Sequence, residues 1–310
     1  MSAGAAPRSA TRGRPKSIAA RLDAYERLVR LDKPIGILLL LWPTLSALWL
    51  ASQGTPSWSH IVIFTMGTIL TRSAGCAVND WADRKLDPFV ERTARRPLAT
   101  CEIPAWEALA VAAVLGLLAF AFVLATNRAA VLLSFPAAAI AIVYPFFKRF
   151  FFLPQGFLGI AFSFGIPMAY AAVFDHVPPI AWWLLGLNAF WVIAYDTEYA
   201  MVDRDDDVKL GLRTSAIAFG RYDVAAVLCC YAVYVGGMVV VGRVLDMGFA
   251  YYAGLAVALG CAAYHGWLIR DRERDRCFVA FRHNHWLGFA VFAGIVVDYA
   301  VRYRAWPNEL

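Results

Sequence analysis

The stretch 105-AWEALAVAAVLGLLAFAFVLAT-126 decides the fold class. Among its 22 residues only Glu107 is charged. About 20 consecutive, mostly apolar residues suffice for one helix to cross the hydrocarbon core of a bilayer. The leucine, alanine, valine and phenylalanine side chains occur all round the helix, which is typical when every side of a helix has apolar surroundings. The stretch therefore predicts a transmembrane helix.

Similar windows recur along the whole chain. Hydrophobic residues make up 60% of the 310 residues, charged residues make up 17%, and the mean hydropathy is +0.56. A soluble domain usually carries about 25% charged residues, so this composition excludes an ordinary soluble enzyme. The sequence predicts an all-α, polytopic membrane protein with nine transmembrane helices. They lie at 35–52, 61–78, 105–126, 129–147, 156–174, 180–195, 224–244, 249–269 and 286–301.

The distribution of lysine and arginine orients these nine helices. Alternate connections, starting with the N-terminal arm, contain 24 of the 29 lysines and arginines, while the opposite set contains 4 and Arg72 lies inside a window. Because cytoplasmic loops are enriched in these residues, we expect the N-terminus inside and the C-terminus outside. Topology thereby explains the net charge of +6. A nucleic-acid partner is excluded, since no basic soluble face remains.

The N-terminal residues differ in composition from the rest of the chain. The first 22 residues contain five basic and no acidic side chains, and residues 1–21 are predicted to form a flexible basic arm in the cytoplasm. Residues 22–310 are predicted to form one transmembrane domain, which begins with an amphipathic interfacial helix at 22–32. A bacterial inner membrane is the expected location. The alternative is a mitochondrial inner membrane, because arginine-rich, acid-poor starts also mark transit peptides.

The first of two acidic clusters, 79-NDWADRKLD-87, follows a predicted helix on the cytoplasmic side. If the helix continues through the cluster, Asn79, Asp83 and Asp87 recur every four residues and share one face. Carboxylates placed so close together near an apolar boundary repel one another, and several ionised ones in one site require cations. The pattern therefore predicts a cation site.

The second cluster, 196-DTEYAMVDRDDD-207, lies at the same predicted side of the membrane. Asp196, Asp203 and Asp207 are separated by seven and four residues, so they too share a helical face. Carboxylate oxygens favour Mg²⁺ or Ca²⁺, and Mg²⁺ typically joins one or two carboxylates to substrate phosphates. Two such faces opposite each other could hold a diphosphate through Mg²⁺.

Basic side chains adjoin both clusters. We expect Lys148 and Arg149 to contact phosphate directly, because their loop is short and leaves them at a helix mouth. The run 92–96, which contains three arginines, is expected to be interfacial or to order its loop. Each of these residues could instead act only as a positive-inside anchor.

These strings resemble the two signatures of the UbiA superfamily of intramembrane aromatic prenyltransferases. The first is Asn79-x3-Asp83-x3-Asp87 followed by Arg92-Thr93 and 95-RRPL-98, and the second is 195-YDTEYAMVDRDDD-207. The second string, with 32-DKPIG-36, 41-LWPT-44 and 144-YPFFKR-149, is similar in particular to the 4-hydroxybenzoate polyprenyltransferases of ubiquinone biosynthesis. One departure is Cys101, where the first signature usually ends in glycine.

The resemblance implies nine helices around a central cavity. It also implies transfer of a polyprenyl chain from polyprenyl diphosphate to the ring carbon ortho to the phenol of 4-hydroxybenzoate, with Mg²⁺ as cofactor. The lipid bilayer is the remaining partner, and no obligate protein partner is expected. The implied metal ligands are Asn79, Asp83, Asp87, Asp203 and Asp207. The implied diphosphate contacts are Arg84, Lys148 and Arg149.

The remaining catalytic candidates are Arg72 and Asp196. Arg72 lies seven residues before Asn79 inside a predicted span, where a charge is costly and indicates function; it could bind the carboxylate of the acceptor, bind an acidic ligand, or extend to the interface. Either Asp196 or Asp203 could accept the ring proton. Two alternatives remain open, namely the same reaction on homogentisate, a naphthoate or a porphyrin, and a divalent-cation transporter. Transport sites usually lie near the bilayer midplane, not at helix ends.

Overall fold

The computed structural model describes residues 17–147 and 149–305, with side chains up to residue 302. Within these residues every element is a helix and none is a strand, as the composition predicts. The helices are α1 (Ile18–Leu28), α2 (Ile35–Ala51), α3 (Trp58–Asp83), η1 (Asp87–Phe89), α4 (Ala105–Leu124), α5 (Arg128–Phe147), α6 (Pro154–Ser163), α7 (Gly165–Phe174), α8 (Pro179–Lys209), α9 (Ser215–Phe219), η2 (Gly220–Tyr222), α10 (Asp223–Val244), α11 (Phe249–Ile269) and α12 (Arg274–Ala305).

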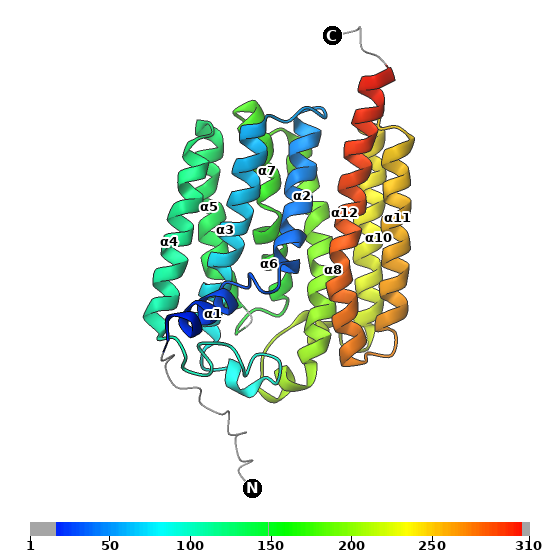
Figure 1. The fold of residues 1–310 in the computed structure, drawn as a ribbon. Coiled ribbons are helices and arrows are strands. Elements are labelled where there is room, and N and C mark those ends of the chain that lie inside the picture. The colour runs from blue at the N-terminus through cyan, green and yellow to red at the C-terminus, as the bar shows by residue number, and fades with distance from the viewer. Residues whose placement is uncertain (1–16, 148, 306–310) are drawn as a thin grey trace.

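The long helices run side by side in alternating directions (Figure 1). The loops after α3, α5, α8 and α11 lie at one end of the bundle, the lower end in Figure 1, and α1 lies across this end. The described C-terminal residues lie at the opposite end. The connections that are rich in lysine and arginine therefore gather at one end of the molecule, together with both acidic clusters.

Seven helices in the described part of the chain are long and apolar enough to cross a membrane. Residues 154–174 count as one of them, although two helices, α6 and α7, make up this segment. Helix α2 is apolar but has only 17 residues. Helix α8 has 31 residues and carries the second acidic cluster in its last turns, so it extends well beyond the predicted window 180–195. The chain is an integral membrane protein.

The break between α6 and α7 lies inside the window 156–174, for which the sequence predicts one helix. Pro167 has no N–H to donate to the carbonyl of Ser163, four residues earlier, and α6 ends at Ser163. The Ser163 hydroxyl donates to the Gly159 carbonyl at 2.6 Å and accepts from Asn188 Nδ2 at 2.8 Å. These bonds tie the broken segment to α8. By contrast, Pro43 lies inside the continuous helix α2.

Helix α1 begins at Ile18, before the predicted boundary at residue 22. The Ser17 hydroxyl accepts from the Ala20 N–H at 3.2 Å and caps the helix. Residues 18–21 are therefore helical, whereas residues 1–16 of the predicted arm lie outside the described residues. Helix α1 packs on α3, and Tyr25 donates to Glu107 of α4 at 2.6 Å.

A close crossing of α11 and α12 leads to a stability prediction. A Cβ added at Gly254 would lie 2.6 Å from the carbonyl oxygen of Ala290 and 2.9 Å from the Cα of Gly294. These are backbone atoms of the neighbouring helix, and small residues are what allow membrane helices to approach so closely. Gly254→Ala is expected to lower the free energy of unfolding by about 1–3 kcal/mol, as overpacking usually does.

The measurement is thermal unfolding of the purified protein in detergent. Gly260→Ala is the matched control, because Gly260 lies on the same helix and nothing lies within 4 Å of an added Cβ. The control should show no loss of stability. Equal shifts in the two variants would contradict close packing at the crossing.

Candidate active site

The end of helix α3 places the first acidic cluster. The helix ends at Asp83, and Asp87 begins the short 3-10 helix η1. The prediction that Asn79, Asp83 and Asp87 share the face of one continuing helix is therefore wrong for Asp87. The reason is Pro88, because a proline has no N–H to donate to the carbonyl four residues earlier, here that of Arg84, so an α-helix does not continue through it.

Two arginines hold the buried carboxylates of this cluster. Arg96 Nη1 lies 3.0 Å from both carboxylate oxygens of Asp87 and 3.0 Å from Asp80 Oδ1. Arg30, which follows α1, donates to Asp80 at 2.8 Å. Burial raises the pKa of Asp87 to about 6; Arg96 opposes this shift, and the nearby Asp80 and Asp83 add to it. Arg96 is thus part of the site.

Helix α8 carries the second cluster and remains helical throughout it, as predicted. Asp203 and Asp207 are buried and Asp196 is half-buried. Arg92 donates from Nε to both oxygens of Asp203, at 3.1 and 3.0 Å, and a second nitrogen of its guanidinium also binds this carboxylate. The guanidinium of Arg92 also binds the Tyr199 hydroxyl and lies over the tyrosine ring, 4.2 Å from its centroid.

The two acidic clusters are therefore joined. Arg92 comes from the loop after the first cluster and binds the second, 111 residues later in the chain. The backbone N–H of Glu91 adds a contact of 3.4 Å to Asp206. The expectation that the run 92–96 is interfacial or orders its loop does not include the contacts of Arg92 with Asp203 and of Arg96 with Asp87 inside the site. Their place in the first signature was a signal, but arginine is also expected in any cytoplasmic loop.

Of the two described residues predicted to contact phosphate, Arg149 places its side chain beside an aspartate of the first cluster, and Arg84 places its side chain over Trp81. Arg149 lies at the C-terminal end of α3, where its Nη2 donates to the Ala82 carbonyl at 2.5 Å and lies 3.9 Å from Asp83 Oδ1. Arg84 folds back over the ring of Trp81, 4.6 Å from its centroid, and donates to the Trp81 carbonyl at 2.6 Å. Lys148 lies outside the described residues.

Arg72 lies within the bundle on α3, against α2. A Cβ at Gly36 would lie 2.7 Å from both Nε and Nη2 of Arg72, so the missing side chain makes room for the guanidinium. Arg72 Cζ is 5.5 Å from the centroid of the Phe162 ring. In the described chain, the buried Arg72 Nε and Tyr195 Oη have no hydrogen-bond partner. Tyr144 and Tyr195 both lie within electrostatic range of Arg72.

Asp196 and Asp83 border the same region. Both lie within electrostatic range of Tyr144, and Asp196 is also within range of Tyr195. Tyr144 thus lies near a member of each acidic cluster as well as near Arg72. A polar region lined by α3, α5 and α8 therefore continues from the acidic end into the bundle.

The chemistry of the donor set fits a hard cation such as Mg²⁺, because the predicted ligands supply only oxygen atoms. In the described residues, however, no group of three or more histidine, cysteine, aspartate or glutamate side chains is arranged to hold a metal ion. Asp87 and Asp203 are instead paired with Arg96 and Arg92. The guanidinium groups hold these carboxylates in place and neutralise their charge.

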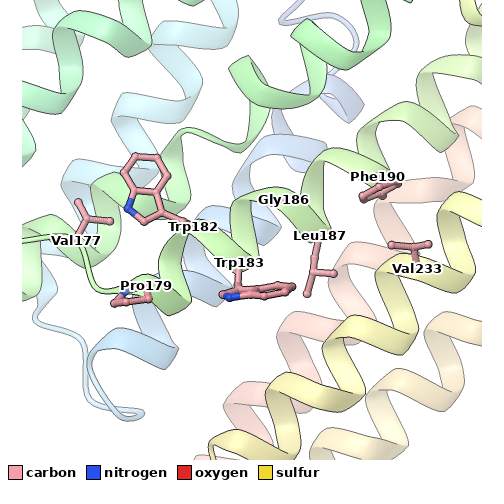
Figure 2. A pocket seen from close by; sticks show the side chains of 8 residues that line it. All are labelled: Val177, Pro179, Trp182, Trp183, Gly186, Leu187, Phe190 and Val233. Atoms are coloured by element: carbon pink, nitrogen blue, oxygen red, sulfur yellow. The ribbon is translucent and has the colours of Figure 1, made fainter.

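An apolar groove of about 680 Å³ lies elsewhere, at the N-terminal half of α8 and beside α10 (Figure 2). Its lining consists mainly of side chains of α8, among them Trp182, Trp183 and Phe190, together with Val233 of α10. Asp203 follows Trp183 by 20 residues on α8, which corresponds to roughly 30 Å along the helix axis. The groove is therefore separate from the acidic site.

Comparison with known proteins identifies relatives of this chain. The model of the UbiA prenyltransferase family matches residues 40–289. A 4-hydroxybenzoate octaprenyltransferase of Cupriavidus necator is 61% identical over 282 residues, which cover 91% of this chain and 99% of the relative. The protein of the same name from Paraburkholderia phytofirmans is 60% identical over 281 residues, covering 91% and 98%.

Solved structures have the same fold. The apo structure of a UbiA homolog from Aeropyrum pernix is 27% identical and superposes with a TM-score of 0.74, covering 85% of this chain and 97% of the homolog. A UbiA homolog from Archaeoglobus fulgidus bound to GPP and Mg²⁺ is 19% identical, with a TM-score of 0.68 and coverage of 87% and 99%. At that identity the second likeness concerns the fold alone.

Proposed function

Because the chain belongs to the UbiA prenyltransferase family, we propose that it transfers a polyprenyl chain to 4-hydroxybenzoate. The donor is polyprenyl diphosphate, the new bond forms at the ring carbon ortho to the phenol, and diphosphate is released. The relatives at 60–61% identity are named for an octaprenyl donor, which supports a long polyprenyl chain here. The reaction belongs to ubiquinone biosynthesis.

One observation carries this proposal, namely the joining of two acidic clusters at the end of an apolar bundle. Arg92 connects the clusters through Asp203, and Arg149 lies beside Asp83. Oxygen ligands and cationic side chains are thereby close together, as a diphosphate with its cations requires. The apolar helices beyond them suit the hydrocarbon chain of the same substrate.

The proposed metal ligands are oxygen donors of both clusters, acting directly or through water. Bound Mg²⁺ would neutralise negative charge on the diphosphate and so help the allylic C–O bond to break. In this proposal Arg92 and Arg96 also fix the positions of the carboxylates of Asp203 and Asp87, which bind the cation. The ligands are Asn79, Asp83, Asp87, Asp203 and Asp207.

The remaining steps use side chains of this protein. Arg149, with Arg84 and Lys148, contacts the diphosphate and offsets the charge that develops as the C–O bond breaks. The electron-rich ring carbon then attacks the allylic carbon, and apolar side chains keep water from this reactive centre. Asp196 or Asp203 accepts the ring proton, and both remain candidates.

Arg72 is proposed to bind the carboxylate of the acceptor. It lies deeper in the bundle than the acidic clusters, on α3 beside Gly36, and its buried Nε has no partner among the described residues. A guanidinium can form two parallel hydrogen bonds with a carboxylate. This contact would turn the phenol end of the acceptor away from Arg72, towards the clusters.

The proposal includes the arrangement in the membrane. We infer nine spans, because α2 and α8 join the seven helices that meet the length and hydropathy criteria. The N-terminus and the acidic end face the cytoplasm, as the excess of lysine and arginine supports. The bacterial relatives support a location in the inner membrane. The domain is proposed to begin with α1.

The experiment is an assay of the purified full chain with octaprenyl diphosphate, Mg²⁺ and labelled 4-hydroxybenzoate. The expected product is C-prenylated 4-hydroxybenzoate, detected by mass spectrometry, and EDTA should abolish its formation. Homogentisate and a naphthoate test the rival acceptors in parallel reactions. If homogentisate or the naphthoate were prenylated and 4-hydroxybenzoate were not, the proposed acceptor would be wrong. Absence of product from every phenolic acid, with metal-dependent cation uptake into liposomes, would favour a transporter instead.

A further inference from the structure

A polar cluster lies buried on the other side of α8 from the acidic site. It comprises Glu198 of α8, Tyr231 of α10, His265 of α11 and Asn284 of α12, whose exposed fractions are 0%, 1%, 0% and 0%. We name it the Glu198 cluster. Four helices thus contribute one polar side chain each to an otherwise apolar contact region, where an unsatisfied polar group is costly.

Asn284 has a fixed orientation in this cluster. Its Nδ2 donates to Glu198 Oε2 at 2.8 Å and to the Ala280 carbonyl at 3.1 Å, while its Oδ1 accepts from Trp191 Nε1 at 2.9 Å. Turning the amide over would place its N–H groups against the indole N–H, donor against donor. Asn284 Oδ1 is therefore an acceptor.

The Tyr231 hydroxyl has three neighbours. Its oxygen lies 2.8 Å from Glu198 Oε1, 2.9 Å from Asn284 Oδ1 and 3.0 Å from His265 Nδ1. A hydroxyl has one hydrogen to donate and two lone pairs to accept. The one hydrogen of Tyr231 cannot serve both Glu198 Oε1 and Asn284 Oδ1. If each of the three short contacts holds a hydrogen, Tyr231 must supply the one towards Asn284 Oδ1, which can only accept, and the other two neighbours must donate. Glu198 Oε1 then carries a proton, and His265 carries its hydrogen on Nδ1.

The surroundings of Glu198 agree with this assignment. When His265 carries its hydrogen on Nδ1, its Nε2 accepts a hydrogen bond from His283 Nδ1 at 3.0 Å. The contact between the two histidines then also has one donor and one acceptor. Cys277 of α12 is a further titratable group within electrostatic range of Glu198. Among the described residues, no lysine or arginine forms an ion pair with Glu198; His265 Nδ1 is 4.0 Å from Glu198 Oε1 and lies closer, at 3.0 Å, to the Tyr231 hydroxyl. An ionised Glu198 would leave two acceptors, its own oxygen and Asn284 Oδ1, competing for one hydrogen.

We propose that Glu198 is a neutral carboxylic acid that fixes the rotation of α8, and hence the direction of Asp203 and Asp207. With about 3.6 residues per turn, Glu198 lies on the face of α8 roughly opposite these two aspartates. The neighbouring Tyr199 stacks on Phe281 of α12 at 4.3 Å and binds Arg92. Glu198 is thus a positioning residue. The positioning role rests on the proposed function, whereas the neutral state does not.

Infrared spectroscopy tests the neutral state directly. The C=O stretch of a protonated carboxylic acid is resolved from that of carboxylates, provided that the detergent contains no esters. The purified protein at pH 7 should show this band, and Glu198→Gln should lose it. Glu273→Gln, which changes an exposed glutamate, should keep it. The absence of the band from the parent protein, or its persistence in Glu198→Gln, would overturn the assignment.

Prenyl transfer tests the positioning role. Glutamine can replace the neutral acid, since its N–H₂ donates to Tyr231 and its oxygen accepts from Asn284, so Glu198→Gln should keep kcat within about twofold. Glu198→Leu should fold, as thermal unfolding in detergent would verify, yet lose about 10–100-fold in kcat and require more Mg²⁺. Equal losses in the two variants, or no loss in a folded Glu198→Leu, would overturn this role. An inactive parent protein would contradict the proposed function and leave the infrared test unaffected.

Discussion

Replacing Asp203 by asparagine is expected to lower kcat by at least about a hundredfold, because charge stabilisation at the breaking bond is lost. Asp203 is buried on α8, and both of its oxygens are bound by Arg92 of the first cluster. Asparagine keeps the size of the side chain but removes the negative charge that a cation requires. The measurement is the rate of product formation at saturating concentrations of both substrates, over a range of Mg²⁺ concentrations.

Asp205→Asn is the matched control for this substitution. Asp205 lies two residues further along the same helix, is exposed, and undergoes the same chemical change. Its kcat should change by no more than about twofold, as is usual for surface positions. If both variants kept full activity in the presence of EDTA, the carboxylates would have no role in holding a cation and the metal-dependent mechanism would be wrong.

Replacing Arg72 by methionine is expected to raise KM for 4-hydroxybenzoate by roughly 10–100-fold, which corresponds to about 1.5–3 kcal/mol for a hydrogen bond to a charged group. The guanidinium lies in the space left by Gly36, inside the bundle. Its removal takes away the partner of the acceptor carboxylate. The KM for the prenyl diphosphate should change much less, since that substrate lies at the acidic end.

A second acceptor and two further variants sharpen this prediction. The parent protein should prefer 4-hydroxybenzoate strongly over 4-hydroxybenzamide, which lacks the carboxylate, and Arg72→Met should largely remove this preference. Arg72→Lys should be intermediate, because lysine keeps the charge but cannot form two parallel bonds. Arg221→Met, at an exposed arginine, is the control. An unchanged KM for 4-hydroxybenzoate in Arg72→Met would exclude the proposed contact.

The identity of the helices could be predicted from composition alone. A stretch such as 105–126 has no polar side that could face water, so only a helix in an apolar environment satisfies both its side chains and its backbone. The structure has α4 at Ala105–Leu124 in this place. Local rules also explain the two departures, because Pro88 accounts for the end of α3 and Pro167 for the break after α6. Applied strictly, these two rules predict both helix ends from the sequence.

The partners of the charged side chains could not be predicted in this way. Arg92 and Asp203 are separated by 111 residues, and nothing in either local pattern specifies their contact. An arginine in a cytoplasmic loop has the same appearance in the sequence whether it anchors the loop or binds a buried carboxylate. The same holds for Asp80, which lies between Arg30 and Arg96.

The sequence by itself therefore determined the helices, the end of the bundle at which the charges gather, and the residue types of the acidic site. Each of these depends on composition or on spacing within one helix. Only the tertiary structure decided which charges meet, that Arg92 and Arg96 hold Asp203 and Asp87, and that Glu198 lies in a separate cluster with side chains from three other helices. The physical reason is that these contacts depend on how helices distant in the chain rotate and pack against one another, and spacing within a single helix carries no information on that.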